Sequence, residues 1–384
     1  MIAPELLRDW EQGRWVALAG ESERPPDHLL PEGPGVVVSS GGSSGGRRLC
    51  LQPLLHLDRS AAATAQWLQA CGMDPASVVL VNPLPSQHVS GLMPWWRARC
   101  WGAQHLRLDP RLMKQPAALL EACRSWPAGP RLLSLVPTQL KRLLDQPAGR
   151  HWLQGFDLIW VGGAALAADL AERARNGGIP LAPCYGSTET AAMVAALPPQ
   201  RFLAGEAGCG DPLPDVEWRL AVDGGLELRT SRLALGCWQP EQPDRLQRLT
   251  DAEGWWRSGD RARLTPGLQI LGRLDTAINS GGETVFPEQL EQRLQAAMLS
   301  AGLPVDAVLL LGIPDPEWGE RLVALVRAED AGVLASVARL TQTWPPAERP
   351  PRWVLCPELA PTEAGKWQRQ HWRRWLERLD AAQA

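Results

Sequence analysis

Short apolar runs separated by stretches with helical spacing make up most of this chain. The runs predict buried strands at 36–38, 77–81, 132–136, 158–161 and 181–185. Amphipathic spacing predicts helices at 4–18, 58–72, 95–101, 116–126, 138–145 and 166–176. Strands that alternate with helices are typical of βαβ units, so we expect an α/β fold with a mainly parallel sheet.

The pattern changes in the second half of the chain. After Gly205 short strands are separated by glycine and proline turns, which predicts a small β subdomain. Beyond Leu274 the sequence predicts a compact α+β unit. We therefore expect a large N-terminal domain, residues 1–273, and a small mobile C-terminal domain, residues 274–384.

The composition is that of an ordinary globular protein, and it excludes several classes of function. The chain has 384 residues, enough for two or three domains with a large core. A net charge of −3 gives no support for a nucleic-acid or anionic-membrane partner. No apolar run has membrane-spanning length and the N-terminus has no signal-peptide core, so we expect a cytoplasmic protein without an integral membrane segment. The eight cysteines are scattered without a CxxC pair, which argues against a zinc or iron–sulfur site.

The segment VVVSSGGSSGGRR, residues 36–48, leads from an apolar run into a loop of glycine and serine. Glycine allows backbone amides to turn toward an anion, serine adds hydroxyl donors and arginine adds positive charge, so the loop suits a phosphate. A flexible linker is the alternative. The segment fails the Walker A pattern because Arg47 and Arg48 stand where Lys and Ser/Thr belong. The candidate phosphate ligands are Ser40, Gly42, Ser43, Ser44, Gly45 and Arg48.

A second candidate is YGSTET, residues 185–190, at the carboxyl end of a predicted strand, where open α/β sheets bind ligands. The hydroxyls of Ser187 and Thr188 beside the carboxylate of Glu189 could hold a phosphate and its Mg²⁺. The alternative is that STET caps the next helix.

Three further motifs are ambiguous when taken singly. A turn would explain SGD at 258–260, and a plain turn would explain the glycine pair in LGRLDTAINSGGE at 271–283. Pro287 after the glycine pair predicts the start of a helix. PTEAGKW at 361–367 contains Lys366, and a surface lysine is the default interpretation. Only three of the 39 basic residues are lysines, however, so Lys366 could mark a site where a guanidinium does not serve.

Taken in order, these motifs resemble those of the acyl-adenylate-forming enzymes, which include acyl-CoA synthetases, luciferases and the adenylation domains of peptide synthetases. The resemblance covers about residues 36–370. Within the family, HVSGLMPWWRA (88–98), LVPTQL (135–140) and VGGAAL (161–166) are most similar to the o-succinylbenzoate–CoA ligases of menaquinone and phylloquinone synthesis. Another aryl- or acyl-CoA synthetase and a nucleotide-binding scaffold without catalysis are the alternatives.

The resemblance implies an AMP-forming ligase that uses ATP, Mg²⁺ and CoA and works in two half-reactions. A carboxylate attacks the α-phosphorus of ATP to give an acyl-adenylate, and the CoA thiol then displaces AMP. Between the two steps the C-terminal domain would rotate about Asp275. Lys366 would then leave the active site, and Gly281 and Gly282 would approach the CoA channel.

The resemblance also assigns roles to the remaining candidates. Residues 39–48 would hold the β- and γ-phosphates, Thr188 the α-phosphate and Glu189 the Mg²⁺, with Lys366 as the catalytic cation. Asp260 would bind the ribose hydroxyls with Arg273 beside it. The adenine slot would be formed by Gly162, Gly163, Ala164, Tyr185 and Gly186. The acid substrate would be bound by His88, Ser90, Arg97 and Ser187, a cation being needed to offset its second carboxylate.

The sequence departs from the family pattern in two places. Arg47 and Arg48 replace the Pro-Lys that normally ends the phosphate loop, so Arg48 would supply charge with a different geometry. The segment before the loop has only about 35 residues, which is short for the family, and we expect part of the N-terminal scaffold to be absent. The expected partners are small molecules, and a homodimer is one assembly open to the chain.

Overall fold

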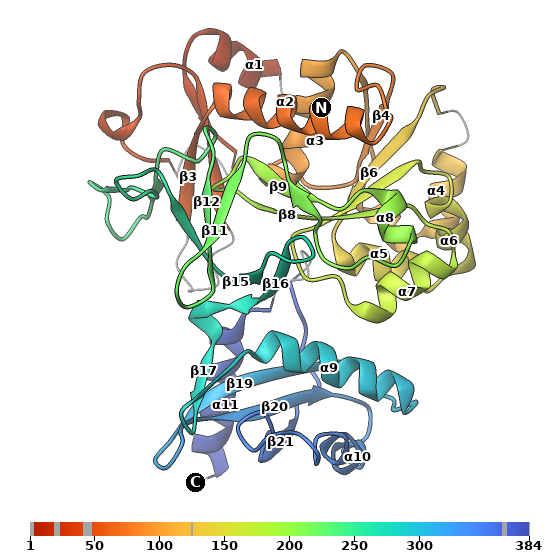
Figure 1. The fold of residues 1–384 in the computed structure, drawn as a ribbon, viewed down its shortest axis with the longest axis vertical. Coiled ribbons are helices and arrows are strands. Elements are labelled where there is room, and N and C mark those ends of the chain that lie inside the picture. The colour runs from red at the N-terminus through yellow and green to blue at the C-terminus, as the bar shows by residue number, and fades with distance from the viewer. Residues whose placement is uncertain (1–3, 19–23, 41–47, 124–125, 363–366, 384) are drawn as a thin grey trace.

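The structure, a computed structural model, describes residues 4–18, 24–40, 48–123, 126–362 and 367–383. Figure 1 shows a large part that contains the N-terminus above a smaller part that ends with the C-terminus. Four sheets and the helices around them build these parts, so the prediction of an α/β fold is confirmed. Among the described residues no helix has both the length and the apolarity that crossing a membrane requires.

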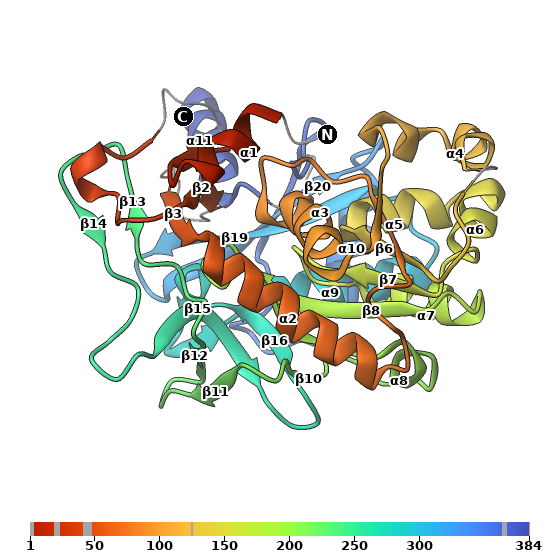
Figure 2. The same cartoon turned by 90° about the horizontal axis from the view of Figure 1, so that it is seen from above.

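Three N-terminal strands and two strands from residues 237–247 form a five-stranded sheet of order β1-β2-β3-β13-β14. β2 and β3 are antiparallel and their last Cα pair is Ser40 with Arg48, so residues 41–47 connect the strands of a hairpin. Figure 2 shows β2, β3, β13 and β14 gathered on one side of the molecule beside α1, Pro4–Glu11. The strands are β1 Trp15–Ala17, β2 Gly35–Ser40, β3 Arg48–Pro53, β13 Cys237–Trp238 and β14 Leu246–Gln247.

A seven-stranded sheet of order β10-β9-β8-β7-β6-β4-β5 forms the centre of the large part. The five strands from β8 to β5 are parallel, as predicted, whereas β9 and β10 add antiparallel pairs at one edge. The strands are β4 Val79–Asn82, β5 Gln104–Arg107, β6 Arg131–Leu135, β7 Leu158–Val161, β8 Leu181–Ser187, β9 Ala192–Ala196 and β10 Asp211–Pro212.

Both faces of this sheet are buried, which explains why its strands read as continuous apolar runs. Leu80, Leu132 and Trp160 pack toward α2 and α3, and the alternate residues Leu133 and Ile159 pack toward α4–α8. The helices are α2 Leu54–Ala70, α3 Val89–Trp101, α4 Pro116–Ala122, α5 Pro137–Leu144, α6 Pro147–Leu153, α7 Ala168–Asn176 and α8 Pro199–Leu203. Two short 3-10 helices are η2 Asp27–Leu29 and η3 Pro110–Lys114.

A four-stranded antiparallel sheet follows where the sequence predicts a small β subdomain. Its strands are β11 Glu217–Leu220, β12 Gly225–Arg229, β15 Trp256–Arg263 and β16 Gln269–Arg273. The short 3-10 helix η4, Leu274–Thr276, then leads into the lower part of the molecule.

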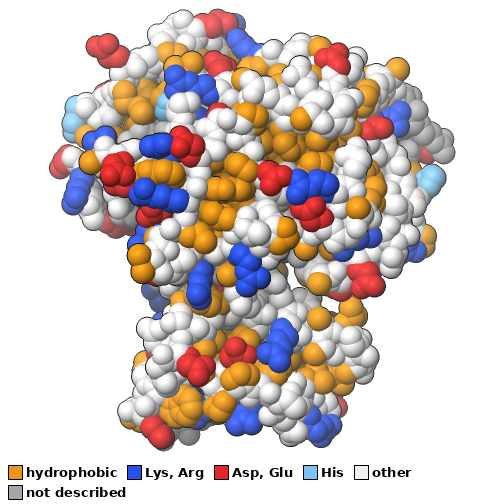
Figure 3. All heavy atoms as spheres, in the orientation of Figure 1, with side chains coloured by type: hydrophobic (Ala, Val, Ile, Leu, Met, Phe, Trp, Pro, Cys, Tyr) orange, Lys and Arg blue, Asp and Glu red, His pale blue; other side chains and the backbone are white. Residues whose placement is uncertain are grey.

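The lower part is an α+β unit in which β17, β18, β19 and β20 form an antiparallel sheet and β21 adds a parallel strand. Its strands are β17 Ile278–Ser280, β18 Glu283–Val285, β19 Ala307–Asp315, β20 Gly319–Arg327 and β21 Arg352–Leu355. Its helices are α9 Pro287–Ser300, α10 Val333–Leu340 and α11 Arg369–Gln383. Two apolar clusters, all from Ile278 onward, form its core, and Figure 3 shows the surface narrowing above it.

Several local predictions are wrong. The helix predicted at 4–18 ends at Glu11, and β1 follows after Gly13, whose φ of +75° helical backbone does not allow. The predicted helix at 58–72 begins earlier, at Leu54. Other elements were not predicted. Among them are β3 and β9, and β5 and α6, which carry no clear apolar period.

Candidate active site

The YGSTET segment forms a hairpin turn between β8 and β9. Ser187 ends β8, and the chain returns as β9 from Ala192, so the alternative that STET caps a helix is wrong. Ala191 and Ala192 have φ values of +49° and +84°, which non-glycine residues adopt at a cost of roughly 1 kcal/mol or more each. The surrounding structure must therefore hold this turn in place.

Two residues that the sequence did not single out hold the turn. Arg232 is fully buried, donates to the carbonyl oxygens of Thr190 and of Met193 (2.9 Å), and pairs with Asp215 at 2.6 Å. Gln52, also fully buried, donates to the carbonyl oxygens of Thr188 (2.8 Å) and Glu189 (3.2 Å). An amide in the otherwise apolar strand sequence LCLQ was the available signal for Gln52.

The turn meets the predicted phosphate loop. The hydroxyl of Thr188 donates to the carbonyl oxygen of Ser39 at 3.4 Å, one residue before β2 ends at Ser40. Arg48, opposite Ser40, has a buried Nε for which the described residues supply no hydrogen-bond acceptor. The hydroxyl of Thr188 thus lies near the start of the loop. At its end lies the Nε of Arg48, which has no acceptor among the described residues. Gly42, Ser43, Ser44, Gly45 and Arg47 lie outside the described residues.

A second set of contacts joins β8 to the four-stranded sheet. The hydroxyl of Tyr185 donates to Oδ2 of Asp260 at 2.5 Å, and Arg273 approaches Oδ1 of Asp260 at 3.4 Å. Asp260 lies within β15, so the alternative that SGD is only a turn is wrong. Arg273, directly opposite Asp260 on β16, also donates to both carboxylate oxygens of Asp275, at 3.0 and 2.9 Å.

Burial dominates the electrostatics of the Asp260 carboxyl. Desolvation raises its pKa above the usual value of 3.8, although the Tyr185 hydroxyl and the Arg273 guanidinium act in the opposite direction. The same burial, with the neighbouring carboxylate, raises the pKa of Tyr185 well above its usual value, so this phenol stays a hydrogen-bond donor. A buried carboxylate between two donors is suited to accept hydroxyls.

The predicted adenine residues lie at the carboxyl ends of two neighbouring parallel strands. Gly162 and Gly163 follow β7, with Ala164 exposed next to them, and Tyr185 lies near the end of β8. A Cβ on Gly162 would lie 2.8 Å from Sγ of Cys184, so β7 and β8 require glycine there. These ends form the sheet edge at which α/β folds bind ligands.

The residues predicted to bind the acid lie on or next to two elements, α3 and β8. His88 immediately precedes α3, and Ser90 is exposed in its first turn. Arg97 follows Ser90 by seven residues, about 10 Å along the helix axis, and is 4% exposed. Ser187 ends β8, and its backbone N–H donates to the hydroxyl of Thr190 at 3.0 Å.

Arg97 is the member of this set with the properties of an anion site. Its guanidinium lies 5.3 Å from the ring centroid of Trp160, and no described residue accepts a hydrogen bond from its buried Nε. Burial lowers the pKa of Arg97 to about 10, but the group stays charged at neutral pH. A buried cation with an unsatisfied donor binds a carboxylate favourably.

The C-terminal candidates lie on different elements. Asp275 is in η4, and Gly281 and Gly282 form the two-residue turn between β17 and β18. Their φ values of +59° and +85° are those of a two-residue hairpin turn, which glycine adopts readily. Pro287 begins α9 as predicted. Lys366 lies outside the described residues.

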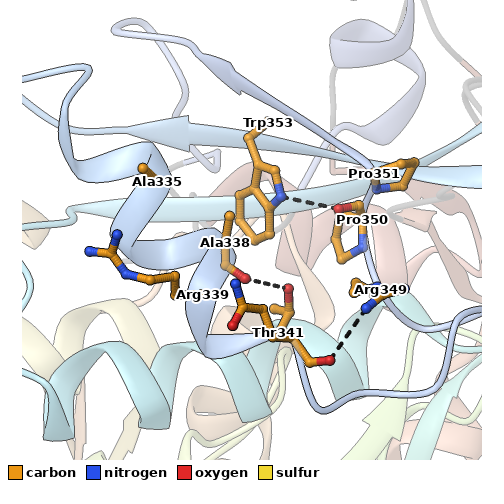
Figure 4. A pocket seen from close by; sticks show the side chains of 9 residues that line it. Ala335, Ala338, Arg339, Thr341, Arg349, Pro350, Pro351 and Trp353 are labelled. Carbon is orange, nitrogen blue, oxygen red and sulfur yellow. Dashed lines mark hydrogen bonds between the residues drawn. The ribbon is translucent and has the colours of Figure 1, made fainter.

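A pocket in the C-terminal part contains none of the predicted site residues. It lies between α10 and β21, and Figure 4 shows Trp353 and Thr341 bonded to the neighbouring carbonyl oxygens of Pro350 and Ala338. Trp353, Thr341 and Arg349 thus have partners within the pocket wall, which gives no reason to place the chemistry there.

The donors around Glu189 fit Mg²⁺ only in company with a phosphate. The described turn offers one half-buried carboxylate, and Mg²⁺ commonly takes one or two carboxylates with phosphate oxygens and waters. The cysteine sulfurs near Glu189 are poor Mg²⁺ ligands. The residues therefore fit an ion that arrives with ATP rather than one held by the protein alone.

Comparison with known proteins decides the family. The model of the AMP-binding enzyme family matches residues 31–230, which is 200 of the 384 residues. The chain belongs to the AMP-binding enzyme family. The match spans both the loop at 41–47 and the YGSTET turn, whereas Asp260 and Arg273 lie beyond its end.

Relatives within the AMP-binding enzyme family carry one recurrent name. The 2-succinylbenzoate–CoA ligase of Escherichia coli is 33% identical over 302 residues, 77% of this chain and 59% of the relative. A structure of E. coli MenE with a bound analogue of OSB-AMS is 29% identical, covers 89% of this chain and 69% of that one, and has a TM-score of 0.64. Bacillus subtilis MenE in complex with ATP and magnesium shares the fold at 21% identity, with 88% and 69% covered and a TM-score of 0.70. The chain thus spans about three fifths of the E. coli relative's length.

Proposed function

We propose that this member of the AMP-binding enzyme family is an AMP-forming o-succinylbenzoate–CoA ligase. The observation that carries the proposal is the convergence of three distant segments: Ser39–Ser40, the turn at Thr188, and Asp260 beside Tyr185. This is the arrangement needed to hold a triphosphate at one end and a ribose at the other. The relatives named 2-succinylbenzoate–CoA ligase support the choice of acid.

In the first half-reaction the acid carboxylate attacks the α-phosphorus of ATP and pyrophosphate leaves. The segment from Ser40 to Arg48 would hold the β- and γ-phosphates, and the Thr188 hydroxyl would donate to the α-phosphate. Glu189 would supply a carboxylate oxygen to Mg²⁺, which offsets phosphate charge when bound. Asp260 would accept the ribose hydroxyls, and the edge formed by Gly162, Gly163, Ala164, Tyr185 and Gly186 would line the adenine.

The acid would present its second carboxylate to Arg97. The buried Nε of Arg97, without an acceptor among the described residues, and the apolar ring of Trp160 suit a carboxylate on an aromatic acid. His88, Ser90 and Ser187 would contact other parts of the acid, since they lie on other turns and strands.

We also propose two domains, 1–273 and 274–384, that rotate relative to each other about Asp275 between the half-reactions. Separate apolar cores on either side of η4 support this division. Lys366 would act on the α-phosphate in the first orientation, and Gly281 and Gly282 would lie near CoA in the second. ATP and CoA as substrates are consistent with a cytoplasmic enzyme.

The test is ATP–pyrophosphate exchange measured with a panel of acids, followed by thioester formation with CoA. We expect o-succinylbenzoate to drive the fastest exchange and to yield the CoA thioester. Faster exchange with a simple fatty acid would replace the proposed substrate while keeping the reaction class. No exchange with any acid, by a protein that still binds ATP, would identify a scaffold without catalysis.

A further inference from the structure

Cys50 and Cys237 lie opposite each other on β3 and β13, although 187 residues separate them in the sequence. Their sulfur atoms are 3.0 Å apart and neither residue is more than 1% exposed. A carboxylate oxygen of Glu189 lies within 4.8 Å of both sulfurs. Among the described residues this is the one such group of His, Cys, Asp or Glu side chains.

The donor set is that of a site for a soft metal ion. Two thiolates and a carboxylate suit Zn²⁺ or Cd²⁺ and do not suit Mg²⁺. Sulfurs bound tetrahedrally at about 2.3 Å from Zn²⁺ lie about 3.8 Å apart, so the pair must open by about 0.8 Å. Three protein ligands leave the fourth position for water or a phosphate oxygen.

The two cysteines belong to a small buried apolar cluster with Ala234, next to the candidate ATP site. Ser40, Arg48 and Cys50 lie on one face of the β2–β3 hairpin, because Ser40 pairs with Arg48 and Cys50 follows Arg48 by two residues. Burial raises the pKa of the Cys50 thiol well above its usual value, and Cys237 and Glu189 act in the same direction. The charge of Arg48 acts against them. Glu189 is half-buried and belongs to the turn that meets this hairpin.

We propose that Cys50, Cys237 and Glu189 form a binding site for a thiophilic divalent cation such as Zn²⁺. The ion binds the two sulfurs and one carboxylate oxygen, and the two thiol protons are released to solvent. A bound ion draws Glu189 away from the Mg²⁺ that accompanies ATP, and it therefore inhibits adenylate formation. This consequence rests on the proposed function, whereas the binding itself does not.

The binding test is titration of the fully reduced protein with Cd²⁺, following the ultraviolet thiolate-to-Cd²⁺ charge-transfer band. We expect one ion per chain in the wild type, and at least about 100-fold weaker binding in Cys50→Ala and in Cys237→Ala. Cys100→Ala, which removes an exposed thiol next to Asp58, is the matched control and keeps the band. Thermal unfolding without metal verifies that the variants are folded. Absence of the band in reduced wild type, or an unchanged band in both folded variants, would overturn the site.

The inhibition test is pyrophosphate exchange with and without Zn²⁺ at fixed MgATP. We expect Zn²⁺ to inhibit the wild type and Cys100→Ala, a chelator to restore activity, and Cys237→Ala to resist. Cd²⁺ binding without Zn²⁺ inhibition would overturn the link to Glu189. An enzyme that shows the Cd²⁺ band but no exchange at all would support the site and contradict the proposed function.

Discussion

At the scale of single residues, the candidate site depends on buried charges whose partners a substrate would complete. Asp260 has two donors in Tyr185 and Arg273, and Arg97 has a ring beneath it but no described acceptor at Nε. Such groups lose hydration on folding and regain interactions on ligand binding. They are therefore the residues at which substitution should affect binding more than folding.

Asp260 should make ATP binding depend on pH. ATP needs the ionised carboxylate as an acceptor, and burial raises the pKa of Asp260 above 3.8, so affinity should fall about tenfold per pH unit below that raised pKa. The free energy of unfolding should change with pH in the opposite direction to the ATP affinity. The folded carboxyl keeps a proton that the unfolded chain has lost. Asp260 therefore contributes fully to the free energy of unfolding below pH 3.8, and this contribution is lost as the pH rises through the pKa of Asp260 in the folded protein. Calorimetric ATP titrations across acidic pH would measure the effect. Asp260→Asn should bind weakly with no such dependence, and an unchanged profile in that variant would assign the titration elsewhere.

Arg97→Met should raise the KM for the acid about 10- to 100-fold, because a charge-assisted hydrogen bond contributes about 1.5–3 kcal/mol. The KM for ATP should stay the same. Arg99→Met is the matched control, since Arg99 is exposed on the same helix and stacks on Trp96. Steady-state kinetics on both variants would measure this, and equal effects on the two substrates would exclude a contact with the acid.

At the scale of elements, the β8–β9 hairpin carries the site and is fixed from outside. Its carbonyl oxygens are bonded by Gln52 of β3 and by Arg232, which follows β12. No periodicity in the hairpin indicates these partners. The turn keeps two alanines at positive φ because the buried guanidinium and amide satisfy the backbone groups that the turn exposes.

Arg232→Met should therefore lower the free energy of unfolding by about 3–5 kcal/mol, because it leaves Asp215 and two buried carbonyl oxygens without their donor. Arg229→Met is the control. Arg229 also pairs with a carboxylate, Glu217, but at the exposed surface, so its loss should lower the free energy of unfolding far less. Urea denaturation of both variants compares the two ion pairs. Equal losses would show that Arg232 does not support the hairpin as described.

At the scale of the whole molecule, the lower part is connected to the upper one through η4, where Arg273 and Asp275 are joined by two hydrogen bonds. Each part has its own apolar core. Packing of this kind permits a rotation of one part against the other without unfolding either. Two predictions depend on that rotation.

Lys366→Ala should reduce adenylate formation by orders of magnitude while thioester formation from preformed adenylate stays near the wild-type rate. The reason is that the proposed lysine contacts the α-phosphate in one orientation only. Lys141→Ala, which breaks a surface pair with Asp145, is the control and should change neither rate. Single-turnover kinetics of each half-reaction provide the measurement. Equal loss in both steps would contradict a role confined to the first.

Asp275→Pro should produce the opposite separation. Proline fixes φ near −65° and so resists the backbone change that a pivot must make, which should slow thioester formation more than pyrophosphate exchange. Asp275→Ala removes the same pair with Arg273 but keeps a free φ, and it should be close to wild type in both steps. Equal rates of thioester formation in the alanine and proline variants would show that this step depends on the ion pair with Arg273 rather than on a pivot at residue 275.

The sequence by itself determined the architecture and the identity of the motifs. Continuous apolar runs predicted the parallel strands β4, β6, β7 and β8, because strands buried on both faces are apolar along their whole length. Pro287 predicted the start of α9, because proline is favoured in the first turn of a helix. The ordered motifs also led to the family that the comparison confirms. The local pattern did not predict where α1 ends or that STET forms a hairpin turn. That turn is held by residues that are distant in the sequence.

Tertiary structure decided which side chains meet. It brings Arg232 and Gln52 to the turn at residues 188–193. It also pairs Cys50 with Cys237 across two strands. The absence of a CxxC pair in the sequence gives no information about cysteines that strand pairing brings together. For Gln52 and for the cysteine pair the physical reason is the same. Contacts between residues more than a hundred positions apart are set by sheet register and burial, and no local spacing in the sequence encodes them.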